Sequence, residues 1–104
     1  MDWANAVIGY ADYDAAYCFL DLSLSRGRRE AMAFLRRYRE VSGVDVEPLW
    51  FWSLATAERA TPDPAAWIGP YAELGRRNLT ARQMRSRFRS FVQAALNDSP
   101  MPTN

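Results

Sequence analysis

Apolar residues recur at helical spacing along this 104-residue sequence, and no stretch alternates convincingly with the period of two that marks a strand. In "GRREAMAFLRRYREVSG" the apolar side chains fall at i, i+3, i+4, i+7 and i+10, with arginines on the other side: Ala31, Phe34, Leu35, Tyr38 and Val41. A second such face follows Thr80: Met84, Phe88, Phe91, Val92 and Ala95. The pattern predicts an all-α fold of four or five helices over residues 1–97, with a polar, disordered tail over 98–104.

Local signals predict where the middle helices begin and end. Gly43 is expected to end the first of these helices, and Asp45 to cap the next one, with Pro48 in its first turn. The following stretch, "LWFWSLATAERA", is apolar nearly all round, which predicts a helix buried on most sides at the centre of the core. Its aromatic residues could stack on a ligand, but their place in an apolar helix favours core packing: Trp50, Phe51 and Trp52.

The last third of the chain contains both breakers and a capping signal. Residues 61–70 include three prolines, which predicts a loop with one short helical turn at most before residues 71–76. Thr80 and Gln83 form the Thr-x-x-Gln pattern of a capping box. The final helix is therefore expected to begin at this box and to run to about Leu96.

Composition excludes several classes of function. The 13 basic and 12 acidic residues give a net charge of +1, so there is no global reason to expect nucleic acid or a membrane as partner. All basic residues are arginine, and the absence of histidine removes imidazole bases and ligands. The single cysteine, Cys18, lies in the apolar run "AAYCFL", which predicts a buried, unreactive thiol and fits a reducing cytoplasm.

Charged residues are unevenly distributed along the sequence. Six arginines lie close together without an acidic residue between them: Arg76, Arg77, Arg82, Arg85, Arg87 and Arg89. Such a basic segment could contact phosphates, but solvation or pairing with acidic residues elsewhere on the protein is favoured. Asp12, Asp21 and Glu58 could line a site for a cationic substrate, but the sequence assigns them no role.

The opening segment differs from the rest because "DWANAVIGYADYD" has no clean period. The next stretch, "DAAYCFLDLSL", has helical spacing, and Asp14 lies near its start. The simplest prediction is a short irregular N-terminal loop that leads into a helix capped by Asp14.

Six residues of this opening segment lie in register with a known motif: Asp2, Trp3, Ala6, Gly9, Asp14 and Ala16. They resemble the pattern, roughly Ile-Asp-Trp-Glu-x-Ala-x-x-Gly-Asp-Pro-x-x-Asp-Leu-Ala, of the aminoglycoside phosphotransferase and choline kinase group, small-molecule relatives of the protein kinases. The middle of the pattern is altered, with Ala4 for the glutamate, Tyr10 and Ala11 for the Asp-Pro pair, and Ala15 for the leucine. The resemblance covers about the first 60 residues well and the rest loosely.

The resemblance implies a fold, a reaction and roles for three residues. The fold would be that of the C-terminal lobe of a kinase-like protein. Asp2 corresponds to the family's Mg²⁺-binding aspartate, and Trp3 and Asp14 would support the metal and catalytic loops. The parent enzyme would use Mg²⁺ and ATP, and would transfer the γ-phosphoryl group to a hydroxyl of a small-molecule alcohol or an aminoglycoside.

Groups that the family requires for catalysis are missing from these 104 residues. A chain without lysine or histidine has neither the strand lysine that holds ATP nor the His-Gly-Asp catalytic loop. We therefore expect a C-terminal, substrate-binding fragment that is inactive alone, binds neither Mg²⁺ nor ATP tightly, and self-associates weakly or binds a missing N-terminal piece. No catalytic residue is assigned. The alternative is a non-catalytic helical interaction module that retains the fold.

Overall fold

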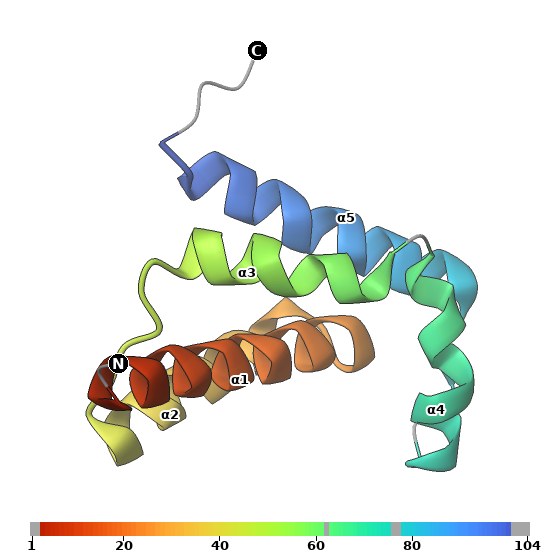
Figure 1. Cartoon of the computed structure of the whole chain (residues 1–104). Helices are drawn as coiled ribbons and strands as arrows, with labels where there is room; N and C mark the ends of the chain where they lie inside the picture. Colours follow the sequence, from red (N-terminus) through yellow and green to blue (C-terminus); the bar gives the residue numbers. More distant parts are fainter. Residues whose placement is uncertain (1–2, 62, 76–77, 101–104) are drawn as a thin grey trace.

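The structure, a computed structural model, describes residues 3–61, 63–75 and 78–100, with side chains from Asp12 onward (Figure 1). These residues form five α-helices and two short 3₁₀ helices, with no strand among them, which confirms the all-α prediction. The elements are α1 (Trp3–Ser25), α2 (Arg28–Ser42), α3 (Leu49–Ala57), η1 (Glu58–Ala60), η2 (Pro64–Trp67), α4 (Ile68–Glu73) and α5 (Ala81–Asp98).

Helix α1 is the element around which the others assemble. It packs against α2, α3 and α5, and α3 lies between α1 and α5, while α4 lies at one end of the molecule (Figure 1). The largest fully buried side chains come from α1, α3 and α5: Phe19, Leu20, Leu24, Thr56 and Met84. The rings of Phe19 and Phe91 lie 5.4 Å apart and join α1 to α5.

The prediction of an irregular N-terminal loop was wrong, because α1 already begins at Trp3. The segment contains no proline and a single glycine, Gly9, and several alanines favour the helix. Asp14 therefore lies in the interior of α1 and is exposed, so it is not the N-cap that the sequence suggested. A weak apolar period did not prevent helix formation here.

Helix α2 ends as predicted at Gly43, which adopts the left-handed conformation at φ 72° and donates its N–H to the carbonyl of Arg39. The apolar face of α2 is narrower than the sequence suggested. Ala31 is fully buried and Leu35 packs against the core, whereas Val41 is 72% exposed at the last turn. The prediction that Val41 belongs to the apolar face that packs against the core was therefore wrong.

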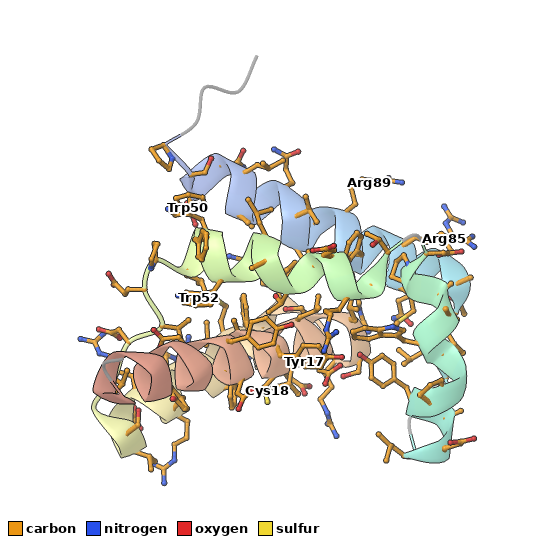
Figure 2. All side chains as sticks on the ribbon, viewed as in Figure 1. Tyr17, Cys18, Trp50, Trp52, Arg85 and Arg89 are labelled. Atoms are coloured by element: carbon orange, nitrogen blue, oxygen red, sulfur yellow. The ribbon has the colours of Figure 1, made fainter. Side chains whose placement is uncertain are left out.

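Helix α3 is less buried than its composition predicted. Its buried residues are small ones, Ser53, Thr56 and Ala57, which let the neighbouring helices approach closely. The predicted core packing of the aromatic residues is confirmed for Trp52, which is half-buried against a core cluster with Ala15, Ala16 and Val46. It was wrong for Phe51, which is 47% exposed, while Trp50 is half-buried (Figure 2 labels both tryptophans).

The start of α3 also differs from the sequence-based prediction. Pro48 is the N-cap residue, in an extended conformation, and no side chain caps this helix. Asp45 instead forms an ion pair with Arg39 of α2, with its Oδ1 at 3.2 Å from the arginine Nε. The prediction that Asp45 caps α3 was therefore wrong.

The C-terminal third is more helical than its prolines suggested. Residues 64–67 form η2, and α4 begins directly after it at Ile68, so most of the predicted loop is helical. The predicted cap is confirmed at Thr80, whose Oγ1 accepts the N–H of Gln83 at 3.1 Å. Helix α5 continues to Asp98, two residues beyond the predicted end, and Asp98 is therefore not part of a disordered tail.

Candidate functional site

The most distinctive concave site lies where α1 meets the segment from η1 to α4. We call it the aromatic cleft, a space of about 450 Å³ whose chemistry-bearing walls are Tyr17, Asp21, Arg59, Trp67 and Tyr71. Tyr17 and Asp21 are four residues apart on α1, so both point from the same face of that helix. The other three come from η1, η2 and α4, which bring residues distant in sequence to one place.

Three aromatic rings form a continuous wall of this cleft. The ring of Trp67 lies 5.9 Å from that of Tyr17 and 6.0 Å from that of Tyr71, the second contact being edge-to-face. These separations are in the range where aromatic pairs attract each other beyond simple burial. The wall therefore presents both aromatic rings and polar phenol groups.

The polar end of the cleft is a short hydrogen bond between Tyr71 and Asp21. The phenol of Tyr71 donates to Oδ1 of Asp21 at 2.6 Å. Burial, together with this bond to a carboxylate, raises the pKa of Tyr71 well above its usual value. Tyr71 therefore stays a neutral donor, and Oδ2 of Asp21 has no hydrogen-bond partner among the described residues. That oxygen is available to a hydroxyl or amine of a ligand.

A cation already lies on this aromatic wall. The guanidinium carbon of Arg59 is 5.8 Å from the ring centre of Tyr17. Burial and the nearby Asp21 raise the pKa of Tyr17, while Arg59 acts in the opposite direction. One carboxylate and one guanidinium thus line the cleft, which suits a small polar molecule that carries hydroxyl or amine donors.

The residues of the sequence motif are only partly visible in the structure. Asp2 lies outside the described residues, and Trp3 is described only as the first residue of α1. Asp14 is exposed, whereas Asp12 is 8% exposed and its Oδ1 has no hydrogen-bond partner. No group of three His, Cys, Asp or Glu residues that could hold a metal ion occurs within the described part of the chain.

Cys18 is exposed rather than buried, so the sequence-based prediction of its burial was wrong. The buried positions of α1 repeat along the opposite side of the helix, at residues 12, 15, 16, 19, 20, 23 and 24, and Cys18 points away from α3 (Figure 2). Partial burial, with Asp21 and Asp14 nearby, raises the pKa of the thiol. A raised pKa disfavours the reactive thiolate, as expected for an unreactive cysteine.

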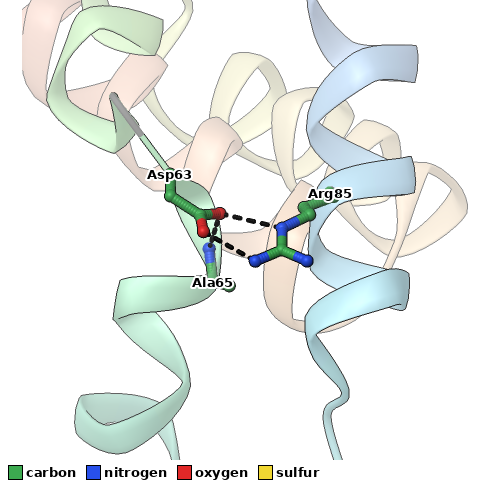
Figure 3. A network of polar contacts seen from close by, with 3 residues as sticks. All are labelled: Asp63, Ala65 and Arg85. Atoms are coloured by element: carbon green, nitrogen blue, oxygen red, sulfur yellow. Dashed lines mark hydrogen bonds and ion pairs between the residues drawn. The ribbon is translucent and has the colours of Figure 1, made fainter.

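The basic segment forms specific contacts rather than one continuous surface. Arg85 binds Asp63 through two parallel bonds, from Nε at 3.1 Å and from Nη2 at 2.7 Å (Figure 3). Asp63 also caps η2 by accepting the N–H of Ala65 at 3.0 Å. The predicted pairing of this segment with an acidic residue is thus confirmed for Arg85, and Arg76 and Arg77 lie outside the described residues.

We predict that this pair makes stability depend on pH in the acid range. The bonds from Arg85 and from the N–H of Ala65 lower the pKa of Asp63 to about 2. Because the folded-state pKa is depressed, the contribution is complete above about pH 4, the ordinary range for aspartate, and is lost as the pH falls towards 2. In Arg85→Gln the pKa of Asp63 should rise towards its ordinary value in a carboxyl NMR titration.

The matched control is Arg89→Gln, which removes the same charge one turn further along α5. Arg89 forms no ion pair with a described residue, so the pKa of Asp63 should remain at about 2. Equal shifts in both variants would show that general surface charge, and not the two parallel bonds, sets the acidity of Asp63.

Sequence reasoning named Asp21 without assigning it a role, and it did not find the aromatic residues of the cleft. Tyr17 and Asp21 carried a signal, since residues four apart share a face of a predicted helix. Trp67 and Tyr71 carried no such signal, because they belonged to a segment predicted to be mainly loop.

In comparisons with known proteins, no family model, no curated protein and no solved structure matched the chain. In the described part of the chain, no helix is both long and apolar enough to span a membrane.

Proposed function

We propose that the chain is the C-terminal, substrate-binding part of an ATP-dependent phosphotransferase that acts on a hydroxyl of a small molecule. The observation that carries the proposal is the position of helix α1. Its residues include five of the six that match the phosphotransferase motif, from Trp3 to Ala16, and one residue later it contributes Tyr17 to the aromatic cleft. A substrate in this cleft would lie on the helix that continues directly from the motif.

The chemistry of the cleft supports a hydroxylated amine as ligand. The free Oδ2 of Asp21 accepts a hydrogen bond from an ammonium or a hydroxyl group, and the faces of Trp67 and Tyr17 attract a cation or the apolar face of a sugar ring. Arg59 would stay near a ligand hydroxyl or move aside as a cation binds. Small alcohols bearing an amine, and aminoglycosides, combine these groups.

Asp2, the residue that the resemblance assigns to Mg²⁺, lies outside the described residues, and the two aspartates described nearest to it do not form a magnesium site. Asp12 and Asp14 lie two positions apart on a helix, so their side chains diverge, and one is buried while the other is exposed. Magnesium needs near-octahedral oxygen ligands and usually relies on carboxylates together with substrate phosphates. No metal-dependent step is therefore assigned to these residues, and the groups that hold ATP would come from outside these 104 residues.

The proposal predicts ligand binding without turnover. Choline and an aminoglycoside, titrated separately by saturation-transfer NMR, should bind weakly and saturably. Asp21→Asn, which keeps an acceptor for Tyr71 but removes the charge, should weaken binding about tenfold, the equivalent of one charge-assisted hydrogen bond. With ATP and Mg²⁺ present, the isolated chain should form no phosphorylated product above background.

The control for charge is Glu58→Gln, because Glu58 is exposed and does not line the cleft. This variant should bind both ligands as the unmodified chain does. Equal weakening of ligand binding in Asp21→Asn and Glu58→Gln would mean that the aromatic cleft is not the binding site. Turnover that follows the purified chain and is lost in Asp2→Asn would instead contradict the proposal that the chain lacks catalytic groups.

The second candidate is a helical interaction module without catalysis, and the exposed aromatic residues of α3 favour it. Phe51 is 47% exposed and forms edge-to-face contacts with both Trp50 and Trp52. Weak self-association was also predicted from sequence, through an apolar surface of the opening segment: Trp3, Val7, Ile8, Tyr10 and Tyr13. Of these residues only Tyr13 has a described side chain, and it is half-buried. Saturable ligand binding that depends on Asp21 separates the phosphotransferase proposal from this one.

A further inference from the structure

A second cleft, on a different face of α1, has the chemistry of an anion site. It measures about 230 Å³, and we call it the serine–arginine cleft after its polar lining: Ser23, Gly27, Arg28, Ser86, Arg87 and Ser90. Ser23 is on α1, Gly27 and Arg28 form the start of α2, and the other three are on α5. The cleft shares no residue with the aromatic cleft.

The start of α2 supplies positive potential to this cleft. The first N–H groups of an α-helix have no acceptor within the helix, and here no side chain caps them. The N-cap is Gly27, which lines the cleft and has no side chain that could cap these groups. An exposed helix N-terminus of this kind favours anions through both its N–H groups and its dipole. Glu30 lies in the same turn, but it pairs with Arg26 at 3.5 Å and does not line the cleft.

Two guanidinium groups add positive charge to this cleft. Neither Arg28 nor Arg87 forms an ion pair with any residue that the structure describes. Arg87 is held in place because its Nη1 donates to the carbonyl of Leu24 at 2.9 Å. Its Nη2 and Nε lie 3.8 and 3.9 Å from the position that a Cβ on Gly27 would occupy. The guanidinium is therefore fixed directly over the turn before α2, which reduces the entropy lost on binding a ligand.

The hydroxyl of Ser23 is an independent sign of a missing partner. Ser23 is 4% exposed, and its Oγ has no hydrogen-bond partner. Ser23 lines the cleft, and its Oγ is covered by neighbouring atoms. Buried hydroxyl groups in folded proteins are nearly always hydrogen-bonded, to protein or to ordered water. An oxyanion in the cleft would supply the acceptor once the Ser23 side chain rotates towards it.

We propose that the serine–arginine cleft binds a tetrahedral oxyanion of the phosphate class, either inorganic phosphate or the phosphoryl group of a small phosphomonoester. The oxyanion would accept hydrogen bonds from Arg28, Arg87, the hydroxyl of Ser23 and the first N–H groups of α2. Ser86 and Ser90 are exposed on the rim formed by α5 and can donate from the other side. A lining with two arginines and three serines, and with no carboxylate, suits a phosphate better than a cation.

The test is calorimetric titration of the full chain with inorganic phosphate at constant ionic strength. We expect saturable binding to one site. Arg28→Gln should weaken binding about tenfold, as the loss of one charge-assisted hydrogen bond predicts. Ser90→Ala, an exposed change with little effect on folding, should weaken it less. The matched control is Arg82→Gln, which removes an exposed arginine of α5 that does not line the cleft, and it should leave the affinity unchanged.

A second measurement separates a direct role of Ser23 from a structural one. In chloride, Ser23→Ala should melt at the same temperature as the unmodified chain or slightly above it, because the change removes an unpaired buried hydroxyl. In phosphate, the unmodified chain should gain more in Tm than the variant does. Comparable affinity for glycerol 3-phosphate would identify a phosphomonoester as the ligand class, and binding of inorganic phosphate alone would identify the free ion.

Two results would overturn the proposal. The first is the absence of saturable phosphate binding to the folded chain. The second is equal weakening in Arg28→Gln and Arg82→Gln, which would mean that phosphate responds only to the general positive charge of α5 and its surroundings.

Discussion

Replacing Phe19 by alanine should cost about 3–5 kcal/mol of unfolding free energy, the usual range for a buried phenylalanine. Phe19 is 2% exposed and its ring lies 5.4 Å from that of Phe91, so its loss opens a cavity between α1 and α5. Domains of this size are stabilised by only about 5–15 kcal/mol in total. Urea unfolding followed by circular dichroism should therefore show a much lower midpoint, with part of the population unfolded in the absence of denaturant.

The same substitution at Phe51 provides the comparison. Phe51 is 47% exposed on α3, so Phe51→Ala removes the same atoms from a site that buries fewer of them. Its expected cost is below about 1 kcal/mol, since surface changes away from the core have small effects. A loss at Phe51 as large as that at Phe19 would mean that the aromatic residues of α3 are covered in solution, as the interaction-module alternative requires.

Local periodicity and capping were sufficient to predict α2 and α5. Each helix carries its own signals, namely an apolar face at the right spacing, Gly43 at the end of one and Thr80 at the start of the other. These signals act within one or two turns, so they need no knowledge of the partner helix. Helix α1 was partly missed because its first half has no clean apolar period, although its alanines favour a helix.

The burial of α3 could not be predicted from its composition. An apolar helix is expected at the centre of a core, but the contact surfaces here are formed by Ser53, Thr56 and Ala57, whose small side chains allow close packing. The larger aromatic side chains are consequently displaced towards the surface. Which face of an all-round apolar helix becomes buried depends on the shapes of α1 and α5, and that information is not local.

The contacts that form the two clefts could not be predicted from sequence patterns at all. The bond from Tyr71 to Asp21 joins residues 50 positions apart, and the bond from Arg87 to the carbonyl of Leu24 spans 63. Neither pair has a fixed spacing that a motif could encode. Even so, the types of residue were informative. Asp21, one of the acidic residues named in the sequence analysis, lines the aromatic cleft, and Arg87, from the basic segment, lines the serine–arginine cleft.

Gly27→Ala should destabilise the chain by about 1–3 kcal/mol because of backbone strain alone. Gly27 adopts φ 104° and ψ 170°, a region that residues with a Cβ almost never occupy. The turn cannot easily relax, since the N–H groups of Arg26 and Gly27 both donate to the carbonyl of Leu22, at 2.8 and 2.9 Å. The measurement is the free energy of unfolding in urea, with the slope on denaturant concentration compared to confirm that the unfolded state is the same.

The destabilisation expected for Gly27→Ala comes from backbone strain and not from a steric clash, and a substitution at a second glycine tests this distinction. A Cβ on Gly27 would meet the guanidinium of Arg87 at 3.8 Å, an ordinary contact with the end of a flexible side chain. Gly69, within α4, has no positive φ and would place a Cβ in open space. The gain in helix propensity of Gly69→Ala is offset because Pro70 follows and disfavours helical backbone at a residue with a Cβ, so stability should change by less than about 1 kcal/mol. If both substitutions had the same effect, the turn between α1 and α2 would not hold the conformation that places Arg28 and the start of α2 at the serine–arginine cleft.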